Sequence, residues 1–162
     1  MARHLRTLVA LALCVIAAFV VVTLRARGWP VVPDLVLLPV LALALTRGSI
    51  AGAALGLAAG WVVDLVPPGN TPLGLTAIIY ATAGAVAGRG TRVGPLPTRW
   101  IAVACLGVAV IPTAAGLLQG AWLGQPLDVS RALTELAITT FAAILVVPPL
   151  VRLDETEGAD RW

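Results

Sequence analysis

Six long apolar runs, separated by short connections rich in arginine, proline and glycine, make up most of this chain. The runs at 7–24 and 100–123 each contain enough apolar residues to cross about 30 Å of hydrocarbon as a helix. Only 12% of the 162 residues are charged, whereas a soluble domain averages about 25%. The sequence therefore predicts an all-α, polytopic membrane protein that forms a single integral membrane domain over residues 1–162.

The six runs predict six transmembrane helices. The expected ranges are 7–24, 35–45, 49–66, 72–88, 100–123 and 133–147, followed by a cytoplasmic tail at 152–162. Pro39 predicts a kink in the second helix, and Pro148-Pro149 predicts the end of the sixth. The first run is expected to remain uncleaved, because Arg25 and Arg27 follow it directly and no small-x-small cleavage site is present.

The arginines predict the orientation of the helices. With six helices, both termini lie on the same side as the connections at 46–48 and 89–99. That side holds Arg3, Arg6, Arg47, Arg89, Arg92, Arg99, Arg152 and Arg161, whereas the opposite side holds Arg25, Arg27 and Arg131. Because cytoplasmic loops carry the excess of basic residues, we expect a multi-pass protein of the plasma membrane with both termini in the cytoplasm.

The stretch GAALGLAAGWVVDL, residues 52–65, places Gly52, Gly56, Gly60 and Asp64 at four-residue intervals. Four residues advance about 400° around a helix, so the three glycines form a slanted groove on one side. Small residues at this spacing allow another helix to approach closely. The groove therefore predicts close helix packing, either against a helix of the same chain or against the membrane helix of a partner protein.

Polar residues of the apolar runs collect at the outer end of the predicted bundle. They are Asp34, Asp64, Gln119, Arg131 and Glu135. Arg131 and Glu135 are four residues apart, which allows an ion pair on one helix face. Carboxylates inside membrane segments usually face the bundle interior or a wet cavity. The set is thus interpreted either as interfacial polar caps or as the lining of an outward-opening polar cavity.

Residues with catalytic or metal-binding chemistry are scarce. The chain has no Ser–His pair, no metal-ligand cluster and no phosphate-binding loop, and its single histidine is His4. Asp34 and Asp64 could act as a carboxylate pair but lie in no catalytic motif. Cys14 and Cys105 have no Cys or His at ligand spacing and are expected to be buried apolar residues. The sequence predicts a protein that is not an enzyme, with no cofactor, no bound metal and no nucleic-acid partner.

The region from Pro33 to about Tyr80 resembles the MreD family, the rod shape-determining membrane proteins of the bacterial elongation machinery. The residues that carry the resemblance are Pro33-Asp34, Arg47-Gly48, the pattern Gly56, Gly60, Asp64-Leu65, then Gly69 and Leu73-Gly74. The other helices match the family only in hydropathy. The chain differs from the family pattern in having Pro67-Pro68 in the turn after Asp64-Leu65.

The resemblance implies a non-enzymatic membrane scaffold or regulator of cell-wall elongation that maintains rod shape. Its implied partners are an MreC-like bitopic protein, the complex of a cell-wall polymerase with a penicillin-binding transpeptidase, and membrane lipid; homo-oligomerisation stays open. The implied fold is similar to the substrate-binding subunits of energy-coupling-factor transporters, so the alternative is a small-ligand-binding subunit of that kind. Aromatic residues, at 5%, are few for a vitamin pocket, which favours the scaffold.

Overall fold

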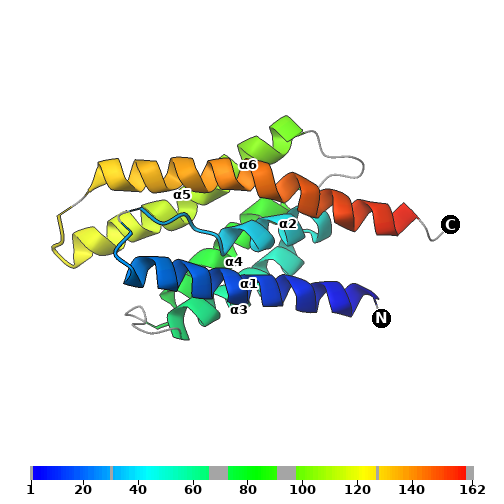
Figure 1. Ribbon diagram of the computed structural model, residues 1–162, viewed down its shortest axis with the longest axis horizontal. Coiled ribbons are helices and arrows are strands. Elements are labelled where there is room, and N and C mark those ends of the chain that lie inside the picture. The colour runs from blue at the N-terminus through cyan, green and yellow to red at the C-terminus, as the bar shows by residue number, and fades with distance from the viewer. Residues whose placement is uncertain (1, 30, 66–72, 91–97, 127, 160–162) are drawn as a thin grey trace.

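A computed structural model describes residues 2–29, 31–65, 73–90, 98–126 and 128–159 of the chain. Within them the fold is all-helical. The helices are α1 (Ala2–Ala26), α2 (Leu37–Arg47), α3 (Ser49–Leu65), α4 (Leu75–Gly88), α5 (Thr98–Trp122) and α6 (Val129–Ala159). The beginning of α1 and the end of α6 lie at one end of the bundle, and the connection between α5 and α6 lies at the other (Figure 1). Each helix overlaps one of the six apolar runs, and α1 and α6 extend beyond theirs at both ends.

The short helix α2 forms the centre of the core. Residues 37–45 are all buried, and α2 packs against α1, α3, α4 and α6. A helix that is apolar on all sides is expected in such a position. Its N-cap is Val36, so Pro39 lies in the first turn, where backbone N–H groups have no partner within the helix. Pro39 therefore removes no helix hydrogen bond, and the reason for the kink predicted there is absent.

Helix α6 is longer than the predicted range 133–147 at both ends, which corrects that prediction. It begins four residues earlier because Asp128 caps it: Asp128 Oδ1 accepts hydrogen bonds from the Ser130 hydroxyl (2.7 Å) and the Arg131 backbone N–H (3.0 Å). It continues through Pro148-Pro149 to Ala159. Val147 and Val151, on either side of the prolines, are 0% and 2% exposed, so core packing holds the helix across the missing N–H groups.

Two helices are long and apolar enough to cross a membrane, among the residues that the structure describes. They comprise Arg99–Trp122 of α5 and Val129–Val151 of α6. The other apolar helical segments, Leu8–Leu24, Leu37–Arg47, Ser49–Leu65 and Leu75–Gly88, are shorter. Every helix except α2 also presents large apolar side chains on the exterior, such as Phe19, Ile50, Ile78, Leu118 and Phe141, each at least 60% exposed. An exterior of this kind is rare in soluble monomers and marks a membrane or protein contact.

Candidate functional site

Helix α4 covers the glycine groove of α3. A Cβ atom added at Gly52, Gly56 or Gly60 would lie less than 3.0 Å from backbone atoms of α4, a separation that real Cβ atoms essentially never show. Gly84 of α4 faces Gly52 in the same way. Of the two kinds of packing that the sequence left open at this groove, the structure shows packing within the chain.

The helix pair α3–α4 is also tied by polar contacts at both ends. At the beginning of α3, the Ser49 hydroxyl donates a hydrogen bond to the carbonyl oxygen of Ala85 (2.7 Å). At the end of α3, Asp64 Oδ2 accepts one from the backbone N–H of Gly74 (2.9 Å), the N-cap of α4. Asp64 is only 4% exposed, and its Oδ1 has no hydrogen-bond partner among the described residues. The carboxylate of Asp64 is therefore buried and joins α3 to α4.

A cavity of about 430 Å³ lies at the end of the bundle that holds the connection between α5 and α6. It is lined by residues from α1, the segment 31–36, α3, α4, α5, the segment 125–128 and α6. Four of the five polar residues predicted to gather at this end line it, namely Asp34, Gln119, Arg131 and Glu135. Asp64 is not among the lining residues. The structure thus has the polar cavity that was one of the two interpretations, but without Asp64.

Asp34 joins three segments at the base of one cavity wall. Its backbone N–H donates to Thr139 Oγ1 of α6 (2.9 Å), and its Oδ2 accepts a hydrogen bond from the Tyr80 hydroxyl of α4. Tyr80 and Thr139 are 6% and 4% exposed. The second helix was predicted over 35–45, directly after Asp34, but α2 begins at Leu37 with Val36 as its N-cap. The backbone between α1 and α2 is therefore held by side chains of α4 and α6.

Tyr80 and Thr139 are site residues that the sequence analysis missed. Tyr80 is the only tyrosine of the chain, and its position inside an apolar run was the one available signal, since a buried Tyr hydroxyl usually has a hydrogen-bond partner. Thr139 gave no signal, because threonine is common in apolar helices and its partner lies 105 residues away in the sequence.

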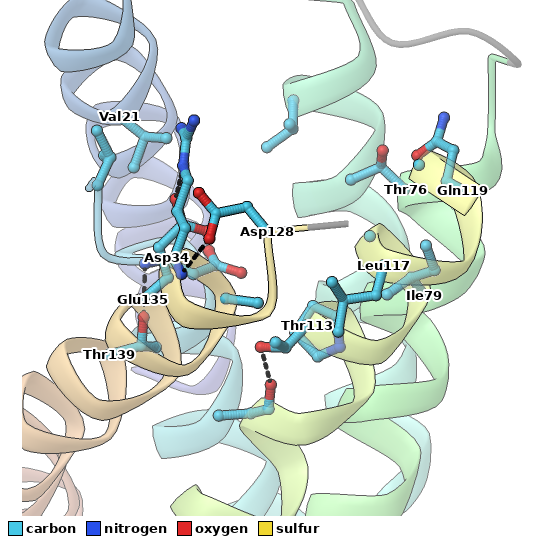
Figure 2. A pocket seen from close by; sticks show the side chains of 18 of the residues that line it. Val21, Asp34, Thr76, Ile79, Thr113, Leu117, Gln119, Asp128, Glu135 and Thr139 are labelled. Atoms are coloured by element: carbon cyan, nitrogen blue, oxygen red, sulfur yellow. Dashed lines mark hydrogen bonds and ion pairs between the residues drawn. The ribbon is translucent and has the colours of Figure 1, made fainter. Parts of the chain in front are cut away.

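One wall of the cavity carries most of its charge. Asp34, Asp128 and Glu135 approach from the segment 31–36, the cap of α6 and α6 itself, and Figure 2 shows them on the same side of the cavity. Arg131 is the one guanidinium in the described lining, and its Nε lies 3.2 Å from Glu135 Oε1, which confirms the predicted i,i+4 pair. The Ser130 hydroxyl and the Arg131 backbone N–H hold the pKa of Asp128 below its usual value. Negative charge therefore predominates on this wall.

The opposite wall is formed by α4 and α5, whose described lining residues are all uncharged. It mixes apolar side chains with the neutral polar side chains of Thr76, Thr113 and Gln119 (Figure 2). Ile79 and Leu117 lie there together with Thr113, whose hydroxyl donates to the Ala109 carbonyl of its own helix (2.9 Å) (Figure 2). On the same stretch of α5, a Cβ atom added at Gly116 or Gly120 would meet nothing within 4 Å. Unlike the glycines of α3, these two glycines leave open space beside the helix.

The structure separates the two carboxylates that the sequence offered as a possible pair. Asp34 and Asp64 do not form a carboxylate pair on one cavity, because only Asp34 lines it. Across the part of the chain that the structure describes, no group of three His, Cys, Asp or Glu residues is placed to hold a metal ion. Cys14 and Cys105 are free thiols with 0% exposure, as their position in apolar runs predicted.

No protein-family model matches the chain, and searches of curated proteins and of solved structures found no match. The helix pair α3–α4 and the cavity beside it are therefore the features from which a function is inferred.

Proposed function

We propose that the chain is a six-span membrane protein that serves as a non-enzymatic scaffold of the cell-wall elongation machinery, in the manner of the MreD family. The observation that carries the proposal is where the residues of the sequence resemblance lie. Gly56 and Gly60 seat α4 on α3, Asp64 binds the N-cap residue Gly74 of α4, and Asp34 binds Tyr80. Residues between positions 34 and 80 thus make contacts that hold α2, α3 and α4 together as one unit.

This convergence supports the resemblance for a physical reason. A Pro-Asp pair, a glycine ladder and an Asp-Leu pair could each arise by chance in an apolar chain. Here each of them makes a contact that fixes one part of the unit to another: Asp34 to α4 and α6, the glycines to α4, and Asp64 to the α4 cap. A rigid unit of this kind is what a scaffold requires, because its task is to hold other proteins in fixed positions.

The six-span arrangement is supported by the exterior and by the cavity. Helices α1 and α3–α6 all present exposed apolar side chains, as lipid contact requires. Helix α2 is about 17 Å long, too short to cross the hydrocarbon alone, and the non-helical segment 31–36 continues it. Irregular backbone is tolerated at membrane depth where it is buried in protein or lines a cavity, and Val32, Asp34 and Val36 do line the cavity. The arginine bias supports an orientation with both termini in the cytoplasm.

An MreC-like bitopic partner would contact a surface other than the glycine groove, because α4 occupies that groove. The outward faces of α5 and α6 present exposed apolar side chains, with Leu118, Phe141 and Leu145 each about 70% exposed. We assign the membrane helix of the partner to this surface, and expect the polymerase–transpeptidase complex to be recruited through the same assembly.

Co-purification tests the proposal. The chain would be expressed with the MreC-like protein encoded in the same genome, extracted in mild detergent and captured by a tag on the partner. We expect recovery of a complex, and recovery reduced by the pair Phe141→Ser and Leu145→Ser but not by Ile50→Ser on α3. Normal expression without capture, together with failure to restore rod shape in cells that lack the gene, would overturn it.

The cavity favours a second candidate function, a small-ligand-binding subunit of an energy-coupling-factor type transporter. A volume of about 430 Å³ lies within the range of small-molecule sites. The two candidates differ in their partners. Capture of ATPase subunits by the tagged chain, or genes for such subunits beside its own, would decide for transport, whereas an adjacent transpeptidase gene would decide for the scaffold.

A further inference from the structure

We propose that the cavity between α4, α5 and α6 binds an organic cation, a molecule with an ammonium group attached to an apolar portion. The inference goes beyond the scaffold role and does not depend on it, because it concerns the chain alone. It rests on the size of the cavity, on the contrast between a charged wall and an uncharged wall that includes apolar side chains, and on the open space along α5.

The charged wall determines which sign of charge the ligand must carry. Three carboxylates line the same cavity: Asp34 from the segment 31–36, Asp128 from the cap of α6 and Glu135 from α6 itself. The one guanidinium of the described lining, on Arg131, is paired along its own helix with Glu135 at 3.2 Å. Charge complementarity favours partners of opposite sign and disfavours like-charged ones. The wall therefore attracts a cation and repels an anion.

The position of Asp34 gives the site a fixed polar point. The Tyr80 hydroxyl and the Thr139 hydroxyl hold Asp34 from two sides, through its carboxylate and its backbone N–H respectively. Both hydroxyl-bearing residues are more than nine-tenths buried, so the orientation of Asp34 is set by the core of the bundle. A carboxylate positioned in this way can accept a hydrogen bond from an ammonium group without first losing conformational freedom.

The opposite wall determines which chemical group suits the part of the ligand beyond its ammonium group. Ile79 and Leu117 face the acidic side across the cavity (Figure 2). Beside Leu117, Gly116 and Gly120 leave open space along α5, since a Cβ atom at either position would meet nothing within 4 Å. Small-molecule sites typically combine an apolar lining with a few placed polar groups. An ammonium group on the acidic wall would thus leave an apolar portion against α4 and α5.

Benzylammonium is a suitable probe, because it has one ammonium group and one apolar ring. The purified full chain would be reconstituted in nanodiscs of phosphatidylglycerol, a lipid without an amine. Binding would be measured by isothermal titration calorimetry, with the heat from protein-free discs of the same anionic lipid subtracted. We expect saturable binding of benzylammonium, and affinities at least about tenfold weaker for neutral benzyl alcohol and for anionic benzoate, since hydrogen bonds to charged groups are the stronger kind. Equal binding of all three compounds, or no saturable binding by the folded chain, would overturn the proposal.

Matched variants locate the site. Asp34→Asn keeps an oxygen acceptor for the Tyr80 hydroxyl, and Asp128→Asn keeps a good helix cap, so both are expected to fold. We expect each to weaken benzylammonium binding several-fold, with Asp34→Asn the stronger of the two. Asp64→Asn is the control, because Asp64 is a carboxylate outside the cavity lining. Loss of binding in Asp64→Asn with full binding in Asp34→Asn would contradict the assignment.

A third measurement identifies the source of the ammonium group. Nanodiscs containing phosphatidylethanolamine present the same group on a lipid head. Weaker benzylammonium binding in these discs supports the site with a lipid headgroup as its occupant, and unchanged binding supports it with a water-soluble amine. Failure of the probe experiment leaves partner capture unaffected, so the two proposals fail separately.

Discussion

The carboxylate of Asp64 and the backbone N–H of Gly74 are joined by a hydrogen bond of 2.9 Å, which ties the end of α3 to the beginning of α4. Gly74 has a φ of +89°, a conformation that glycine adopts readily. The N–H groups of the first turn of a helix have no partner within it, and a negative charge at that end is favourable for the helix dipole. Asp64 thus completes α4 and stabilises the glycine packing between the two helices.

Substitution of Asp64 tests this structural role. Asp64→Asn keeps an oxygen that can accept from Gly74, whereas Asp64→Leu removes it and leaves the N–H unsatisfied. We expect Asp64→Leu to lower the free energy of unfolding by about 1–3 kcal/mol and Asp64→Asn to lower it less. Thermal unfolding in detergent measures the difference. Equal stability of the two variants would show that the hydrogen bond is not important.

Replacing glycine by alanine should lower the stability of the fold in the glycine groove of α3 and raise it on the exposed side of α5. Gly56→Ala places a methyl group against the backbone of Tyr80 and should cost about 1–3 kcal/mol through overpacking. Gly107→Ala, on exposed α5, meets nothing within 4 Å and should stabilise by up to about 1 kcal/mol through helix propensity. Thermal unfolding of the two variants in the same detergent checks both. A Gly56→Ala variant as stable as Gly107→Ala would mean that α3 and α4 do not pack closely.

Two neighbouring threonines of α6 offer a matched pair. Thr139→Val removes the acceptor that the Asp34 N–H uses, so a loss of about 1–3 kcal/mol is expected. Thr140 Oγ1 is buried and has no hydrogen-bond partner among the described residues, so Thr140→Val should change stability by less than about 0.5 kcal/mol or increase it. Urea or thermal unfolding distinguishes them, and a reversed order would contradict the contact between Asp34 and α6.

Hydropathy located the helices because burial and lipid contact both require apolar side chains over whole helical turns. It misplaced the ends of α6, where local contacts decide. The cap formed by Asp128 lies outside the apolar run, and the buried residues Val147 and Val151 hold the helix across two prolines. Asp is one of the preferred N-cap residues, so the beginning of α6 was predictable in principle.

The cavity was predictable in part, for a related reason. Polar residues in or beside apolar runs are conspicuous, and four of the five that were singled out do line the cavity. The sequence could not show that α4 begins beside Asp64 and uses its carboxylate as a hydrogen-bond acceptor, so Asp64 was grouped with the wrong neighbours. Nor could it show that Tyr80 and Thr139 meet Asp34, because these contacts depend on how α2 inserts between α4 and α6.

The cap of α6 predicts a dependence of stability on pH. The pKa of Asp128 is lowered in the folded chain, first by the Ser130 hydroxyl and then by the Arg131 N–H. A carboxylate with a lowered folded pKa stabilises the fold above its unfolded pKa, about 3.9 for Asp, and this stabilisation is lost as the pH falls through the folded value. We expect the melting temperature of the wild type to exceed that of Asp128→Ala at pH 7, with the gap narrowing below about pH 4. A gap independent of pH would assign the effect to the side chain's shape alone.

The orientation of the bundle can be tested with single cysteines, because the two native ones are fully buried and should react slowly. Leu123→Cys lies at the connection between α5 and α6, the end with few arginines, and Arg89→Cys lies at the opposite end; both positions are exposed. Positive residues are retained on the cytoplasmic side, so a membrane-impermeant maleimide should label Leu123→Cys in intact cells and Arg89→Cys only after permeabilisation. The opposite pattern would invert the topology, place the cavity mouth in the cytoplasm and exclude an extracytoplasmic source for its ligand. Labelling of both variants in intact cells would contradict the six-span arrangement itself.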